Sequence, residues 1–553
     1  MEPNRNRNTT IIAIGAIYLM GTNSIAATYN VDEGRLHHIQ EDLADITIVE
    51  RTPEFAGDLT TFDNTRDGND VRITAVGKRN ISYKNEIYGS PINNLELGEN
   101  GDAPTETLVR TDVRRLTLFG DEMKTVIAED SAVGEVYGDK NKKIQLKNDG
   151  EIGVIKDVEY VINNGVIRDF RGSDELINTK NGIVMLGGPS QYTKKLQNYG
   201  TIVTNDTGVY LVGSTDAYNS GRIQGGKSPG LTMGTNGGKI VNDGEITNDY
   251  SEDDVTPAIT LINRSELLVI TNNGTIKGSA SAIGYAMTDN STIINNGIID
   301  GDITRLVFPV GDPEGLNSDI TLINNAGGVW TGGFKDSTLG QFNFVNEVQT
   351  IENHGTIKPK KDNRTGIPTI RSREIINDGT IDLLDDSLTI IGNYTGRPGA
   401  QLVTAGKLGG DETPVNSLRI TGTVSGDATQ VYVNNLGGTG AATVDGILVV
   451  RADTVDGEGF SKGERIVAGA YDYDLVKVRG DGYTEWRLTS ELTPEPPGPT
   501  PPVPPGPTPP VPPGPTPPVP PKPVHKIRPE AGAYAENLRQ ANTLFLTGAD
   551  QRR

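Results

Sequence analysis

The chain has 553 residues with 51 basic and 72 acidic side chains, for a formal net charge of −21, and it contains no cysteine. An acidic excess of this size disfavours binding to the phosphate backbone of nucleic acids. The lack of cysteine excludes disulfides and thiolate-bound zinc, and it leaves nothing to obstruct a chain that crosses a second membrane unfolded.

Residues 1–27 predict a secretory signal peptide. Arg5 and Arg7 give a positive start, residues 9–20 supply an apolar stretch, and Ala26 and Ala27 lie at the expected cleavage site. The apolar stretch is too short to span a bilayer comfortably. We therefore expect export through the inner membrane by the Sec machinery.

Residues 28–145 are β-rich without a distinctive motif, and a repeat region follows at 146–387. Nine variants of Asn-x-Gly-x-Ile occur there, and Asn324-Asn325-Ala326 is a degenerate tenth copy. Most neighbouring glycines lie roughly 21 to 30 residues apart, the size of one unit of a solenoid. The nine repeat glycines are Gly150, Gly165, Gly200, Gly221, Gly244, Gly274, Gly297, Gly355 and Gly379.

Each copy reads as a strand, a corner and a second strand, because β-branched residues precede the Asn and alternate after the Gly. Gly and Asn tolerate positive φ, so we expect the corner to use that conformation. The pattern predicts an all-β, right-handed parallel β-helix in which corner asparagines of successive coils share amide hydrogen bonds. Ordinary β-hairpins are the alternative, since Asn-Gly is also a hairpin signal.

A third β-rich segment at 388–493 is followed by a Pro-rich linker at 494–525 and a short helix within 526–553. The linker repeats an eight-residue Pro-rich period, which is typical of extended polyproline II spacers. In the helix, Tyr534, Leu538, Ala541 and Phe545 form one apolar face. An isolated helix of this length is only marginally stable in water, so we expect it to pack against a partner.

Two of these segments resemble the pertactin-like type V autotransporters. The resemblance rests on the segments 388–396, 431–440, 446–450 and 470–473, closed by Trp486-Arg487-Leu488, and on Arg528-Pro529-Glu530-Ala531-Gly532-Ala533-Tyr534. It implies a β-helical passenger, an autochaperone-like folding module at 388–493, and a translocator that starts at 526–553. An outer-membrane β-barrel translocator is then the implied partner, and the cell surface or outer membrane the implied location.

The sequence departs from that family after Phe545, because Arg553 is its last residue and no barrel strands follow. We expect a truncated gene product, or a passenger separated from its barrel. Without a barrel, the expected location is the periplasm or the medium.

Residues suited to catalysis, cofactor binding or metal binding do not group in the sequence. His37, His38, His354 and His525 lack neighbours at ligand spacing. The paired acids Asp253-Asp254 and Asp385-Asp386 are interpreted as turn residues, with glycoside hydrolysis as the alternative. Arg479-Gly480-Asp481 matches an integrin-recognition triplet, although a Gly-Asp corner that joins two strands is the simpler interpretation.

The function expected from these features is that of an exported adhesin, in biofilm formation or autoaggregation. Its polar face would contact a host or bacterial surface, or a second copy through Asn, Thr and Ser side chains. A β-helical enzyme that degrades polysaccharide and a non-functional remnant are the alternatives.

Overall fold

The computed structural model describes residues 26–31, 37–41, 45–50, 59–64, 69–76, 83–99, 105–187, 191–205, 208–234, 237–249, 256–262, 267–286, 290–307, 320–333, 337–339, 342–360 and 366–490. The predicted Pro-rich linker and C-terminal helix, and residues 1–25 of the predicted signal peptide, lie outside these ranges. The described residues contain strands and no α-helix. They belong to two compact units, of which the first comprises 1–323, 328–330 and 336–348 and the second 324–327, 331–335 and 349–553.

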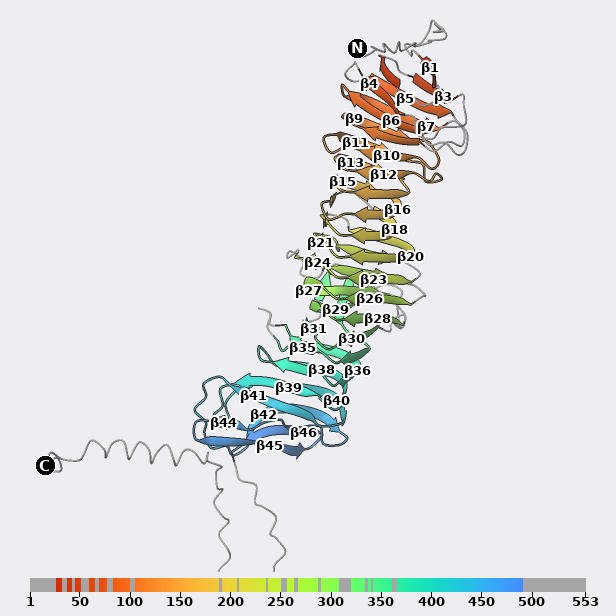
Figure 1. Ribbon diagram of the computed structural model, residues 1–553. Coiled ribbons are helices and arrows are strands. Elements are labelled where there is room, and N and C mark those ends of the chain that lie inside the picture. The colour runs from red at the N-terminus through yellow and green to blue at the C-terminus, as the bar shows by residue number, and fades with distance from the viewer. Residues whose placement is uncertain are drawn as a thin grey trace, which may run out of the picture. The chain divides into compact units, whose positions relative to one another are not determined.

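The first unit is built from parallel strands in which each strand pairs with the equivalent strand one coil further along the chain (Figure 1). One sheet holds the strands that follow the corners, and we call it the post-corner sheet. Its strands are β1 (Ala26–Val31), β3 (Asp45–Glu50), β5 (Asn69–Val76), β7 (Ile92–Glu99), β9 (Val113–Leu118), β11 (Ala132–Tyr137), β13 (Glu151–Lys156), β15 (Val166–Arg171), β17 (Ile183–Leu186), β19 (Thr201–Thr204), β21 (Arg222–Gly225), β24 (Glu245–Asn248), β27 (Thr275–Ala286) and β29 (Ile298–Val307).

The pre-corner sheet of the first unit holds the strands that lead into the corners. They are β2 (His37–Glu41), β4 (Leu59–Asn64), β6 (Tyr83–Gly89), β8 (Thr105–Val109), β10 (Lys124–Ile127), β12 (Gln145–Asn148), β14 (Tyr160–Asn163), β16 (Ser173–Asn178), β18 (Gln191–Asn198), β20 (Val209–Asn219), β23 (Gly238–Asn242), β26 (Leu268–Asn272) and β28 (Ser291–Asn295). Strands β22 (Leu231–Gly234) and β25 (Ile259–Ile262) belong to a third face that also includes parts of β18, β20, β27 and β29. The antiparallel strands β32 (Ser337–Leu339) and β33 (Phe342–Asn346) pair with one another, and β33 pairs with β29.

Two aliphatic columns fill the interior of the first unit. The residue two places after the Gly and the residue two places before the Asn both point inward, as the period of two in a strand requires. The resulting columns are Ile152, Ile167, Val184, Ile202, Ile223, Ile246, Ile276 and Ile299 on one side, and Leu146, Val161, Leu176, Leu196, Ala217, Ile240, Ile270 and Ile293 on the other, all at most 5% exposed. The prediction of an all-β parallel β-helix is therefore confirmed.

The second unit repeats this arrangement before it changes. Its parallel strands are β34 (Thr350–Asn353), β35 (Thr356–Pro359), β36 (Thr369–Asn377), β37 (Thr380–Leu383), β38 (Leu388–Gly396), β39 (Gln401–Gly406), β40 (Leu418–Gly426), β41 (Thr429–Asn435), β42 (Ile447–Val455) and β43 (Phe460–Lys462). The antiparallel strands β44 (Ile466–Ala468), β45 (Tyr471–Gly480) and β46 (Tyr483–Thr489) follow, and β46 pairs with β42. The division between the units passes through β30 (Ile320–Asn324) and β31 (Val329–Gly332).

Loops of the second unit are fixed by two polar side chains. The Asp411 carboxylate accepts hydrogen bonds from the backbone N–H of Val444 at 3.0 Å and of Gly446 at 2.7 Å. The Tyr473 hydroxyl lies 2.8 Å from Gly409 O and 3.0 Å from Ala441 N. These bonds tie the turn before β40 to the long connection between β41 and β42.

The corner glycines are required for close approach and not for φ. The expectation of positive φ at the corners is wrong, because none of the nine repeat glycines has a positive φ. Instead, a Cβ built on Gly244 would lie 2.1 Å from Gly221 O in the preceding coil, and one on Gly274 would lie 2.0 Å from Gly244 O. Coils that stack at about 4.8 Å leave no room for a side chain at this point.

Replacing Gly244 with Ala should therefore destabilise the protein strongly, by about 3 kcal/mol, because backbone and not a flexible side chain occupies the space. Gly187→Ala is the matched control, since a Cβ there meets nothing within 4 Å, and its effect should stay within about 0.5 kcal/mol. Urea unfolding followed by circular dichroism measures both. Equal stability of the two variants would contradict the close-approach explanation.

Acid should weaken the second unit through Asp411. Desolvation raises the pKa of Asp411, but the backbone N–H groups of Val444, Asp445 and Gly446 and the charge of Arg487 together lower it below its ordinary value. A lowered folded-state pKa contributes stability above the unfolded pKa of about 3.9, and this contribution is lost as the pH falls through the folded pKa. Melting temperatures between neutral pH and pH 3 should fall less steeply for Asp411→Asn than for the wild type. Asp385→Asn, at an exposed turn, serves as the control and should follow the wild type, whereas parallel curves for Asp411→Asn would refute this role.

Candidate functional surface

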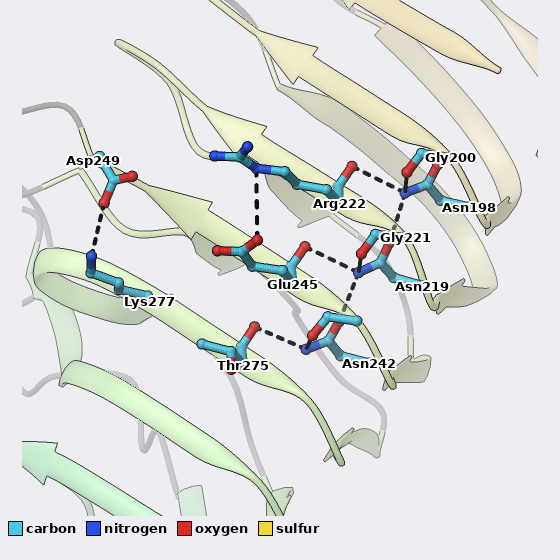
Figure 2. Close-up of polar contacts among 11 residues, drawn as sticks. Asn198, Gly200, Asn219, Gly221, Arg222, Asn242, Glu245, Asp249, Thr275 and Lys277 are labelled. Atoms are coloured by element: carbon cyan, nitrogen blue, oxygen red, sulfur yellow. Dashed lines mark hydrogen bonds and ion pairs between the residues drawn. The ribbon is translucent and has the colours of Figure 1, made fainter. Parts of the chain in front are cut away.

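The repeat asparagines of the first unit form one continuous side-chain ladder. Each amide Nδ2 donates to Oδ1 of the Asn in the next coil at 2.7 to 2.9 Å, and Figure 2 shows three members. The ladder side chains are at most 2% exposed. In chain order they are Asn148, Asn163, Asn178, Asn198, Asn219, Asn242, Asn272 and Asn295.

The second amide proton of each ladder residue holds the backbone. Asn198 Nδ2 lies 3.2 Å from Gly200 O in its own corner and 3.2 Å from Arg222 O in the next coil (Figure 2). One side chain therefore closes its own corner and fixes the next coil beneath it. The first member, Asn148, has a buried Oδ1 without a hydrogen-bond partner, because Ile127 occupies the equivalent register in the preceding coil.

In the second unit a ladder runs from Asn324 to Asn353 and Asn377 at 2.7 Å per step and then changes chemistry. Asn377 Nδ2 donates to the Tyr394 hydroxyl at 3.0 Å, and this hydroxyl lies 2.7 Å from Thr429 Oγ1. Burial raises the pKa of Tyr394 to about 12, so the hydroxyl stays protonated. Tyr394 also stacks on Phe460, which meets Trp486 edge-on, so aromatic packing replaces the amide ladder here.

One corner of the first unit departs from the Asn-x-Gly spacing and was not predicted. Asn178 belongs to the ladder although Gly182, the corner glycine of its coil, lies four residues later and not two. A Cβ on Gly182 would lie 2.4 Å from Asn163 O, so the close-approach requirement is the same. The signal in the sequence was Ile183-Val184 after a Gly, in register with Thr201-Ile202.

The ladder asparagines are buried within the coils, so they cannot make the contacts between molecules that their abundance suggests. The positions just outside the ladder remain accessible. Asn296 Nδ2 donates to Asn273 Oδ1, Asn273 Nδ2 donates to Asp243 Oδ1, and the Tyr218 hydroxyl donates to Asp243 Oδ2. In the second unit His354 Nδ1 lies 2.6 Å from Asp378 Oδ1 at the equivalent place.

Opposite charges pair across coils on the post-corner sheet. Arg222 lies 3.7 Å from Glu245, and Lys277 lies 3.4 Å from Asp249 (Figure 2). All four side chains are about half exposed, so each pair contributes little to stability. The pairs instead neutralise this face.

The Arg479-Gly480-Asp481 triplet occupies the tip of the β45–β46 hairpin, where all three residues are exposed. Gly482 closes the turn with φ of 76°. The ring of Tyr483 covers Gly480, since a Cβ there would meet the ring at 2.2 Å, and the Arg451 guanidinium lies 4.1 Å from the ring centroid. Packing against the Tyr483 ring explains why residue 480 is Gly. The adhesive role of the triplet stays a prediction.

The other residues singled out in the sequence are dispersed. His37 and His38 lie in β2, and His525 and Asp253-Asp254 fall outside the described residues. Asp385 and Asp386 lie in the turn before β38, where Asp386 accepts a hydrogen bond from Ser387 N. Within the described residues no group of three His, Asp or Glu is placed to hold a metal ion.

Ala26 and Ala27, the predicted cleavage residues, are the first two residues of β1. The described part of the chain also contains no helix long and apolar enough to cross a membrane. The cleavage position stays a prediction.

Comparison with known proteins adds a domain and several relatives. Residues 373–475 match the family described as Autochaperone Domain Type 1. This match overlaps most of the 388–493 segment predicted as a folding module, and it includes Tyr394, Asp411, Phe460 and Tyr473.

Three relatives carry informative names. The autotransporter adhesin AIDA-I of Escherichia coli is 34% identical over 165 residues, covering 30% of this chain and 11% of that protein. The probable autotransporter YfaL of E. coli K12 is 26% identical over 588 aligned positions, 97% of this chain and 42% of that protein. The adhesin BmaC autotransporter of Brucella suis is 41% identical over 137 residues, 22% of this chain and 4% of that protein. The chain thus spans less than half the length of each.

The ladder asparagines should contribute more to the free energy of unfolding than the exposed asparagines beside them. Asn242→Ala leaves the Asn219 amide without its acceptor and Asn272 Oδ1 without its donor, so we expect a loss of at least about 2 kcal/mol. Asn273→Ala, one residue outside the ladder, removes only exposed bonds and should cost less than about 1 kcal/mol. Urea midpoints of the full chain distinguish them. A smaller loss for Asn242→Ala than for Asn273→Ala would show that the ladder is not stabilising.

Proposed function

We propose, from the relationship to autotransporter passengers that the autochaperone match and the adhesin relatives support, that this chain acts as an exported adhesive passenger. Its role is to contact other cells through an extended repeated surface, and it does so without catalysis. Outer-membrane translocation and display at the cell surface belong to the same proposal.

The observation that carries this proposal is the arrangement of polar groups on the described surface. Accessible polar side chains recur once per coil in columns, as in the series Asn296, Asn273 and Asp243. An enzyme that cleaves polysaccharide needs two carboxylates converging on one bond. A column of single groups suits a contact surface that gains avidity by repetition.

Secretion requires further elements, which we propose on the resemblance alone. The Sec machinery would export the chain, cleavage would occur near Ala26 and Ala27, and an outer-membrane translocator would carry the passenger outward. The module around residues 388–493 would fold first, because the rings of Tyr394, Phe460 and Trp486 pack against one another within it.

Display of the full chain ahead of an autotransporter translocator tests the function. Bacteria carrying the display should aggregate in static culture and adhere to epithelial monolayers more than bacteria carrying the translocator alone. Incubation with envelope and plant polysaccharides should release no reducing sugar above that control.

Protease accessibility of the displayed chain on intact cells confirms that it has reached the surface. Sugar release without aggregation or adhesion would replace the adhesive proposal with the hydrolytic alternative. A displayed, protease-accessible chain that neither aggregates, adheres nor hydrolyses would refute both.

A further inference from the structure

The outward face of the pre-corner sheet in the first unit carries two columns of side chains along its eight ladder coils. Three residues before each ladder Asn, the strand register aligns one residue per coil. We call this the charged column: Gln145, Tyr160, Glu175, Lys195, Asp216, Lys239, Val269 and Thr292. The second column, one residue before each Asn, is mostly uncharged: Lys147, Ile162, Ile177, Gln197, Tyr218, Val241, Thr271 and Ile294.

The centre of the charged column alternates in sign over four successive coils, as Glu175, Lys195, Asp216 and Lys239. Among the described residues only its first half is paired, since Lys195 Nζ lies 2.7 Å from Glu175 Oε1. Asp216 and Lys239 are both exposed and form no ion pair with any described residue. Two opposite charges on adjacent strands are thus available to a partner.

An alternating column of even length is complementary to its own reverse. A two-fold axis along the strand direction, placed between the coils of Lys195 and Asp216, turns a second copy to face the first with its coil order reversed. Glu175 then faces Lys239 of the other copy, and Lys195 faces Asp216. Every charged pair is opposite in sign. If the two charged columns faced one another in the same direction and register, each charge would meet a like charge.

The same axis brings the second column into compatible contacts. Because eight coils carry the ladder and the axis lies at their middle, Ile177 faces Val241, Ile162 faces Thr271, and Gln197 faces Tyr218. The charged column adds a contact between Tyr160 and Val269. No like charges meet in either column, and the only charge in the second column, Lys147, faces Ile294 at the rim.

We propose that this face is a homotypic contact surface through which two copies of the chain associate in antiparallel orientation. The inference rests on the proposed adhesive function and identifies the partner of one face as a second copy. Antiparallel pairing is the orientation in which passengers anchored on two facing cells would meet.

The size of the face predicts a weak contact. Seven steps of about 4.8 Å and a width of four strand residues give roughly 35 by 13 Å, so two copies bury on the order of 1,000 Å². Interfaces near this limit are transient, and many copies on one cell would add avidity. Alternating charges also predict that added salt weakens the contact.

Sedimentation equilibrium of the purified full chain tests the proposal. Wild-type protein should dimerise reversibly at low salt, and its dissociation constant should rise at least tenfold between 50 mM and 500 mM NaCl. Asp216→Lys places a second lysine against Lys195 of the other copy, and Lys195→Asp places a second aspartate against Asp216. Each variant alone should therefore be monomeric at concentrations where the wild type is dimeric.

A mixture of the two variants tests the proposed pairing most directly. In the mixed pair Lys195 of one variant faces Asp216 of the other, and the two replaced positions face one another with opposite charges, so the heterodimer should form. Asp130→Lys, the same charge change at an exposed turn outside this face, should behave as the wild type. Circular dichroism shows whether each variant folds.

Dimers of either variant alone at wild-type affinity, or no heterodimer from folded variants, would overturn the proposed surface. A wild-type chain that stays monomeric would also overturn it. Adhesion of displayed cells to epithelial monolayers is measured separately, so the adhesive function can survive the loss of this surface. If displayed cells neither adhere nor aggregate, the adhesive function itself is refuted.

Discussion

The register of the buried asparagine amides is the constraint on which the rest of the first unit depends. Each amide must meet the next at 2.7 to 2.9 Å, although consecutive ladder residues are separated by as few as 15 and as many as 30 residues of chain. Coils of different length therefore accommodate their extra residues away from the corner, as at β22 and β25. The corner glycines follow from the same constraint, because coils held at this spacing leave no space for a Cβ. Fixed registers then align outward side chains into columns, which is how a local motif produces a repeated surface.

The second unit shows what happens where the ladder ends. The hydroxyl of Tyr394 takes the place of the next amide, and the aromatic contacts of Tyr394, Phe460 and Trp486 take over the interior. Antiparallel pairing of β46 with β42 then covers an edge that parallel stacking would leave open. Asp411 and Tyr473 hold the intervening loops with hydrogen bonds to backbone. The match to an autochaperone domain ends at residue 475, so it includes Tyr394, Asp411, Phe460 and Tyr473 but not Trp486 or β46.

The fold could be predicted because one short motif determines both the corner and the two inward columns, as at Asn242, Gly244 and Ile246. Its physical reason was harder to predict, since Gly suits both positive φ and close approach, and only the position of Gly221 O decides between them. Asn178 was missed because its coil has a longer corner. The homotypic surface could not be predicted, because the alignment of Glu175, Lys195, Asp216 and Lys239 depends on coil lengths that the motif does not specify. The Arg479-Gly480-Asp481 triplet was found from sequence, but its exposure on a hairpin tip needed the structure.

The central claim is that the ladder amides are hydrogen-bonded inside the coils while the neighbouring outer amides are not protected. Hydrogen exchange of side-chain NH2 groups, measured by NMR on chain labelled selectively at Asn, tests it most directly. The account predicts strongly slowed exchange at Asn219, Asn242 and Asn272 and rapid exchange at Asn273 and Asn296. Equally rapid exchange at both sets would mean that the amides are open to water and that the stacked register does not hold.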